Sequence, residues 1–216
     1  MGTVQIDGST PKITVGNATA EDATILFDGN AQDFYIALDD SADDLVIGLG
    51  STIGTTPIIS LTEGGAVTMK NIGTGDDNPM VLTLQTSEID MAANDILGSI
   101  RFQAPDEGTG TDAILIAASI DAVSEGNFSS SSNATKLSFK TGVSEAASEK
   151  MSLSSAGLLT IADDLVIKDA GTIGSSSDAD AIAIASNGVV TFTQAPVFPD
   201  GSLALADLDI DGGTDI

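Results

Sequence analysis

Carboxylates are by far the most abundant ionisable side chains in this sequence. The chain has 32 Asp and Glu residues against seven Lys and Arg, and it contains no His, Cys or Trp. Two carboxylates about 5 to 9.5 Å apart hydrolyse glycosidic bonds when they flank a bound sugar. Aromatic rings that could stack on a sugar are scarce, and the single Tyr is Tyr35. We therefore expect no catalytic residues and no enzyme, and the lack of His excludes Ser-His-Asp and His-metal sites.

One run of aspartates matches the start of a calcium-binding loop. Asp207, Asp209, Asp211 and Gly212 fit the pattern D-x-D-x-D-G, but the glutamate that completes such a loop would fall beyond Ile216. The neighbouring residues alternate as strands do, whereas an EF-hand loop lies between two helices. Outward-facing aspartates on a strand are the favoured interpretation, with calcium as the alternative. We predict no metal site and no cofactor.

Three of the seven basic residues lie close together in sequence, at Lys136, Lys140 and Lys150. An anionic glycan could contact these side chains. Pairing with the abundant neighbouring carboxylates is the favoured interpretation, because exposed lysines and carboxylates readily form weak ion pairs. No residue of the sequence is singled out as a receptor-binding residue.

The net charge narrows the range of partners. A formal charge of −25 makes nucleic acid a poor partner, because affinity for nucleic acid comes mainly from Lys and Arg that neutralise phosphates. Anionic membrane surfaces are disfavoured for the same reason. The most apolar stretch, residues 113–120, is far shorter than the roughly 20 residues that span a bilayer as a helix. We therefore expect neither nucleic-acid binding nor membrane insertion.

One eleven-residue phrase occurs three times, at residues 59–69, 151–161 and 182–192. Each copy has apolar residues at its first, third, ninth and eleventh places. The glycine at the seventh place of each copy is Gly65, Gly157 or Gly188. Alternation with period two predicts strands, and the polar middle with its glycine predicts a reversal of the chain. Each copy is therefore predicted to form a β-hairpin whose glycine takes a positive φ.

The repetition extends beyond the hairpin. Residues 43–54 and 163–174 both begin with Asp-Asp-Leu-Val-Ile, end with Thr-Ile-Gly and run into a copy of the phrase. This duplication predicts two strand-and-hairpin modules, as in a rod built from stacked units. The predicted domains are an N-terminal β meander at 1–42, the modules at 43–69 and 163–192, a central β domain at 70–162, and a connector at 193–216.

Composition and periodicity together predict an all-β, elongated, repeat-built fibrous protein. Its short strands and hairpins could form β-sandwich, β-prism or β-helix-like modules. The only expected helix is a short one at residues 87–94, where Ser87 could cap a first turn that contains Glu88 and Asp90. The alternation continues up to the last residue, so we interpret the connector as truncated from a longer protein.

Several segments resemble, in order and spacing, a region common in bacteriophage tail fibres. They are residues 98–102 (GSIRF), 113–117 (AILIA), 136–141 (KLSFKT), 149–153 (EKMSL) and 157–161 (GLLTI). Residues 33–50 and 209–216 also resemble repeats in the fibres of marine tailed phages. In that family the region often precedes an intramolecular chaperone domain, and nothing here resembles that domain with its catalytic Ser and Lys. Counted from residue 33 to residue 161, with residues 209–216 added, the resemblance spans about two thirds of the chain.

The resemblance implies an intertwined homotrimer that serves as a virion component, made in the bacterial cytoplasm and attached to other tail or virion proteins. Such a tail fibre projects from the particle and contacts a glycan or protein receptor on the bacterial surface. A purely structural head or tail fibre or spacer, a repeat-type bacterial adhesin, and a polysaccharide-degrading tailspike are the alternatives.

The residues give an independent reason to expect a trimer. Short strands with few aromatic side chains cannot close a large core within one chain, whereas three copies around an axis can share one. The aliphatic residues of the phrase are the expected lining of that axis: Leu61, Val67, Leu153, Leu159, Ile184 and Val190.

Overall fold

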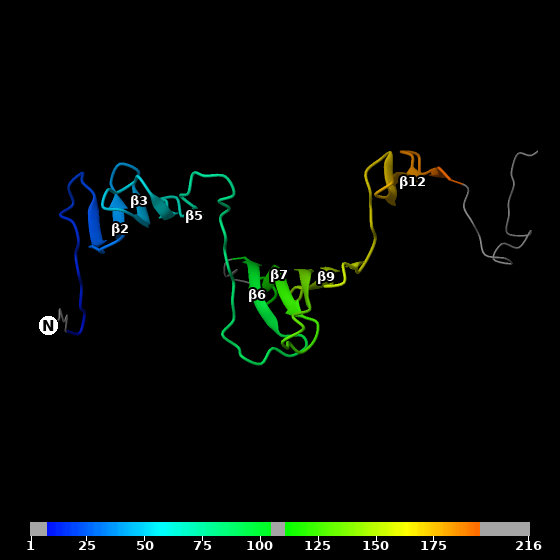
Figure 1. The fold of residues 1–216 in the computed structure, drawn as a ribbon, viewed down its shortest axis with the longest axis horizontal. Coiled ribbons are helices and arrows are strands. Elements are labelled where there is room, and N and C mark those ends of the chain that lie inside the picture. Colours follow the sequence, from blue (N-terminus) through cyan, green and yellow to red (C-terminus); the bar gives the residue numbers. More distant parts are fainter. Residues whose placement is uncertain (1–7, 105–110, 195–216) are drawn as a thin grey trace, which may run out of the picture. The chain divides into compact units, whose positions relative to one another are not determined.

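The computed structural model describes residues 8–104 and 111–194, and these residues form strands, turns and irregular segments without any helix (Figure 1). The chain divides after Thr83 into two compact units. Three antiparallel sheets make up the described structure, one in the first unit and two in the second. The all-β class predicted from sequence periodicity is confirmed.

The first unit contains a five-stranded antiparallel meander in the order β1-β2-β3-β4-β5. Its strands are β1 (Ala23–Phe27), β2 (Phe34–Asp39), β3 (Asp44–Leu49), β4 (Pro57–Leu61) and β5 (Val67–Met69). The small core of this unit contains Tyr35, Ala37 and Val46, against which Ile53 from the β3–β4 loop packs. Gly48 lies opposite Tyr35 in the ladder, and a Cβ at this position would collide with the Tyr35 hydroxyl.

The second unit contains a five-stranded and a three-stranded antiparallel sheet. The larger sheet consists of β6 (Ile96–Gln103), β7 (Ile116–Ser124), β8 (Thr135–Thr141), β9 (Ser148–Leu153) and β10 (Leu159–Ile161). The smaller sheet consists of β11 (Gly171–Ser175), β12 (Asp178–Ile184) and β13 (Val190–Phe192). Every connection between neighbouring strands in these sheets joins antiparallel partners, as short β-meander links require.

The three copies of the phrase form the three hairpins β4–β5, β9–β10 and β12–β13, all in the same register. In each copy the amide of the glycine donates to the carbonyl three residues earlier, at 2.9 to 3.0 Å. Gly65, Gly157 and Gly188 have φ of 81°, 81° and 84°, the left-handed conformation predicted for them. A type I turn followed by a left-handed residue is a common hairpin connection, and glycine adopts it without steric cost.

The short helix expected at residues 87–94 is not present. The Ala92 amide donates to the carboxylate of Asp95 at 2.6 Å, and the Asn94 amide donates to the carbonyl of Ser124 at 3.0 Å. Asn94 also has a φ of 74°, which an α-helix does not allow. The backbone groups of this segment therefore bond to a local turn and to the end of β7 instead of to each other.

The N-terminal meander differs from its prediction in two respects. Its alternating residues Ile13 and Val15 lie outside the sheets, and residues 1–7 of the predicted meander lie outside the described residues. The predicted boundary between residues 42 and 43 falls within one sheet, because β2 and β3 pair directly across it. Residues 70–83 of the predicted central domain belong to the first unit, and the rest to the second.

Candidate assembly surfaces

One face of the first sheet is apolar on every strand. Because its strands pair in register, the residues that face the same way form rows across the sheet. One row is Ala23, Leu38, Leu45, Leu61 and Val67, and the next is Ile25, Ile36, Ile47, Ile59 and Met69. Most of these side chains are exposed, whereas Tyr35, Ala37 and Val46 on the opposite face are buried. The β3–β4 loop thus covers one face, and the apolar face is open.

The two sheets of the second unit repeat this arrangement. In the larger sheet the apolar rows are Ile100, Ile120, Phe139, Met151 and Ile161, and Ala122, Leu137, Leu153 and Leu159. In the smaller sheet they are Ile173, Ile182 and Phe192, and Ile184 and Val190. We call these three surfaces the open apolar faces. Each is made of large hydrophobic side chains that are exposed or only half-buried in the single chain.

The six residues expected to line a trimer axis all lie on the open apolar faces. They form three cross-strand pairs: Leu61 with Val67, Leu153 with Leu159, and Ile184 with Val190. Val67 is 61% exposed and Leu159 is 55% exposed. The residues predicted from the sequence lie only in the three hairpins, whereas the open apolar faces also include the neighbouring strands. The alternation in β2 and β3 was the signal that could have extended the prediction.

The opposite face of the larger sheet carries a network of charged and hydroxyl side chains. Lys140 pairs with Asp121 and Lys136 pairs with Glu149, each at 2.8 Å. Ser99 donates to Asp121, and Ser138 donates to Glu149 at 2.7 Å. For Lys136 and Lys140 the predicted pairing with carboxylates is confirmed. Lys150 is exposed and has no such partner among the described residues.

These contacts change the acidity of both carboxyl groups. Burial raises the pKa of Asp121, but the hydrogen bonds from Lys140 and Ser99 outweigh it, so the net pKa lies below the ordinary value. Hydrogen bonds from Lys136 and then Ser138 lower the pKa of Glu149. Because both groups stay charged at neutral pH, this face remains hydrophilic while the face behind it is apolar.

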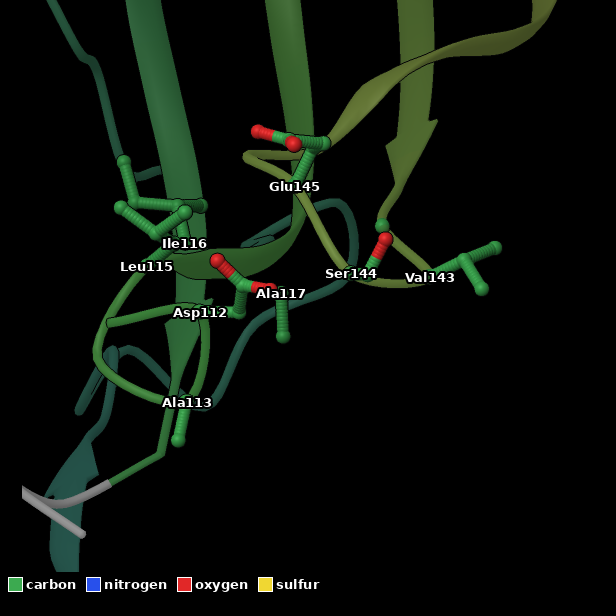
Figure 2. A pocket seen from close by; sticks show the side chains of 9 residues that line it. Asp112, Ala113, Leu115, Ile116, Ala117, Val143, Ser144 and Glu145 are labelled. Atoms are coloured by element: carbon green, nitrogen blue, oxygen red, sulfur yellow. The ribbon is translucent and has the colours of Figure 1, made fainter. Parts of the chain in front are cut away.

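A pocket of about 240 Å³ lies at the end of the larger sheet where β7 begins and β8 meets β9. Figure 2 shows Asp112 on one side of it and Ser144 and Glu145 on the other. The remaining lining residues are Ala113, Leu115, Ile116, Ala117, Gly142 and Val143. Two carboxylates are therefore present, but no aromatic ring lines the pocket, so it lacks a stacking platform for a sugar.

The described residues contain no cluster of three or more potential metal-ligating side chains. The aspartates at 207, 209 and 211, which match the start of a calcium loop, lie outside the described residues. In the described ranges there is also no helix long and apolar enough to cross a membrane.

Comparison with known proteins adds no relative to this description. No family model, no curated protein and no solved structure matches the chain. The fold and the open apolar faces are therefore the features that indicate the function of this chain.

Proposed function

We propose that this chain is a self-assembling fibrous protein whose open apolar faces are covered by two further copies of the same chain. The observation that carries the proposal is the uncovered hydrophobic face on each of the three sheets. A water-soluble monomer rarely exposes contiguous apolar surface of this kind, and such patches mark interaction sites. A single antiparallel sheet also needs another layer against one face to form a stable core.

The size of the core supports the same proposal. Among the described residues, the only buried hydrophobic side chains are Tyr35, Ala37, Val46, Met91 and Val123. A chain of 216 residues that folds alone buries far more, because about 70% of its unfolded surface is removed from water. Assembly around a threefold axis supplies the missing core, with the six axis residues and their rows facing inward.

When the open apolar faces point towards the axis, the opposite faces of the sheets and the loops lie on the outside of the assembly. The two ion pairs then lie on the face turned away from the axis, where Lys136, Lys140 and Glu149 are partly exposed and Asp121 is buried beside Lys140. A rod of this design is suited to adhesion and reach, with three identical sites that bind together. Together with the sequence resemblance, this supports a phage tail fibre in the virion that attaches to other tail proteins and contacts a bacterial surface glycan or protein.

Light scattering behind size exclusion tests the assembly. We expect an elongated species of three times the chain mass of 21.7 kDa. Three chains, each with a net charge of −25, repel one another, so high salt should favour the assembled form. A compact, stable monomer at micromolar concentration in high salt would refute the proposal.

A pair of variants locates the surface. Leu153→Asp with Leu159→Asp places two charges on the open apolar face of the larger sheet, so we expect a monomer. Thr160→Asp changes an exposed side chain on the opposite face of the same hairpin and should leave the mass unchanged. Equal effects of the two changes would show that this face is not the interface.

Sedimentation with bacteria distinguishes a tail fibre from a structural spacer. Labelled assembled protein should sediment with cells of a susceptible host and not with resistant cells. The monomeric double variant provides the control, because loss of threefold attachment should weaken sedimentation by orders of magnitude. Binding to no tested cell would favour the spacer, and release of soluble sugars would favour the tailspike.

A further inference from the structure

Residues 163–167 repeat the sequence of residues 43–47, most of which belong to a paired strand, but they pair with no strand among the described residues. Residues 43–47 and 163–167 are both Asp-Asp-Leu-Val-Ile. In the first copy, residues 44–47 belong to β3 and pair with β2 on one side and β4 on the other. In the second copy the segment lies outside all strands. Val46 is 2% exposed, whereas its counterpart Val166 is 87% exposed.

The backbone of the segment is also unpaired. Among the described residues, no backbone group accepts a hydrogen bond from the amides of Leu165, Val166 and Ile167. Adjacent aliphatic residues on both sides of an extended chain, with free amides and carbonyls, have the properties of an unprotected edge strand. Such a strand either pairs with another chain or is a site of aggregation.

Within its own chain the segment cannot pair with the hairpin β12–β13 as β3 pairs with β4, because β11 already pairs with β12. In the first module β3 pairs with β4, the first strand of the phrase hairpin. In the second module β11 pairs with β12, the equivalent hairpin strand. The turn closed by the bond from the Gly171 amide to the Lys168 carbonyl, at 2.9 Å, separates the segment from β11 without forming a ladder.

We propose that residues 163–167 form a strand that pairs with the sheet edge of a second copy of this chain, so that the copies exchange strands. The segment directly follows β10, whose Leu159 lies on an open apolar face, so a second copy seated on that face lies within reach. Pairing would satisfy the free amides and cover Leu165, which is 67% exposed in the single chain. This inference rests on the assembly proposed above.

Hydrogen exchange measured by mass spectrometry tests the strand exchange. The peptide that covers residues 163–168 should exchange at least tenfold more slowly in the assembled protein than in the monomeric Leu153→Asp, Leu159→Asp variant. Fast exchange in a trimer would overturn the strand exchange and leave the assembly intact. Equally slow exchange in trimer and monomer would assign the partner to the same chain and overturn it as well. A protein that is monomeric at every concentration and salt would overturn both proposals.

Two substitutions at one position provide a second measurement. Val166→Pro removes the amide that a ladder needs, whereas Val166→Thr keeps the amide and a β-branched side chain. We expect Pro to raise the concentration at which half of the trimer dissociates by at least tenfold and Thr to change it little. Equal values for Pro and Thr would exclude a backbone ladder at this residue.

Discussion

The two copies of the duplicated module have different structures although they share Asp-Asp-Leu-Val-Ile and Thr-Ile-Gly. In the first copy, Asp-Leu-Val-Ile lies in β3 and Thr-Ile-Gly lies in the β3–β4 loop, from which Ile53 packs on the core. In the second copy, Asp-Leu-Val-Ile pairs with none of the strands in the described ranges, and Thr-Ile-Gly lies in β11. Intrinsic β propensity is the same in both, so the neighbours of each segment decide its structure.

One substitution between the copies explains much of this difference. The residue after Ile47 is Gly48, whereas the residue after Ile167 is Lys168. Gly48 lies against Tyr35, where even a Cβ would collide with the ring and with the carbonyl of Thr56. A lysine in that place could not pack in the same way. The second copy also follows a phrase hairpin, and in the described part of the chain the strand directly before it is the short β10 and not a counterpart of β2.

The largest expected difference in stability is between Val46→Asp and Val166→Asp, the same substitution at equivalent positions of the two copies. Val46→Asp buries a carboxylate without a partner under the β3–β4 loop, and should destabilise the first sheet by at least about 3 kcal/mol. Val166→Asp in the monomer changes an exposed side chain and should cost no more than about 0.5 kcal/mol. Denaturant unfolding followed by Tyr35 fluorescence and by hydrogen exchange of both segments measures these costs. Equal losses would contradict the difference in burial.

The next effect concerns the position where the copies differ. Gly48→Ala should cost about 1 to 3 kcal/mol, because the new methyl group meets the Tyr35 ring and backbone atoms that cannot move away easily. Lys168→Ala should change the stability of the monomer by less than about 0.5 kcal/mol, since Lys168 is exposed. The same unfolding measurement applies. A neutral Gly48→Ala would show that Gly48 does not account for the divergence.

A smaller loss of stability is expected from substitutions at the left-handed glycine that all three hairpin turns share. Gly157→Val should cost about 1 to 2 kcal/mol, because valine in the left-handed region brings its Cβ against the backbone. Apart from the adjoining residues, no atom lies within 4 Å of the place a Cβ would take at Gly157, so the cost comes from the local backbone conformation. Ala156→Val beside it should cost much less. Gly65→Val and Gly188→Val should match Gly157→Val, and unequal costs would show that the three turns are not equivalent.

Local signals predicted the hairpins and failed where distant contacts decide the structure. The glycine and the alternation lie within eleven residues, so the phrase carries its own turn and register. The residues from Ser87 to Asn94 carry a helix-capping signal, but their backbone bonds to Ser124, which the local pattern does not reveal. The extent of the open apolar faces depends on the register between neighbouring strands. The repeated phrase predicted that register only for the two strands of each hairpin.

The smallest expected effect separates the two units by their response to acid. The described ion pairs both lie in the larger sheet of the second unit, and they hold the pKa values of Asp121 and Glu149 below the ordinary 3.8 and 4.5. A carboxyl group with a lowered folded-state pKa stabilises the fold above its unfolded-state pKa. That stability is lost as the pH falls through the folded-state pKa. We expect a loss of up to about 1 kcal/mol per pair below about pH 4.5 in this sheet.

Acid also reduces the repulsion among the carboxylates of a chain with a charge of −25, and this stabilises both units. Asp121→Asn isolates the ion pair, because it removes one titrating group and leaves the rest of the repulsion nearly unchanged. At neutral pH the natural sequence should be more stable than the variant, since Asp121 holds Lys140 at 2.8 Å. As the pH falls through the lowered pKa of Asp121, the difference in stability should shrink towards zero, because the protonated carboxyl no longer attracts the lysine.

Hydrogen exchange of β7 and β8 at each pH, with β2 and β3 as the internal reference, measures this difference in stability. A difference that stays constant with pH would show that the contribution of Asp121 to stability does not depend on its charge.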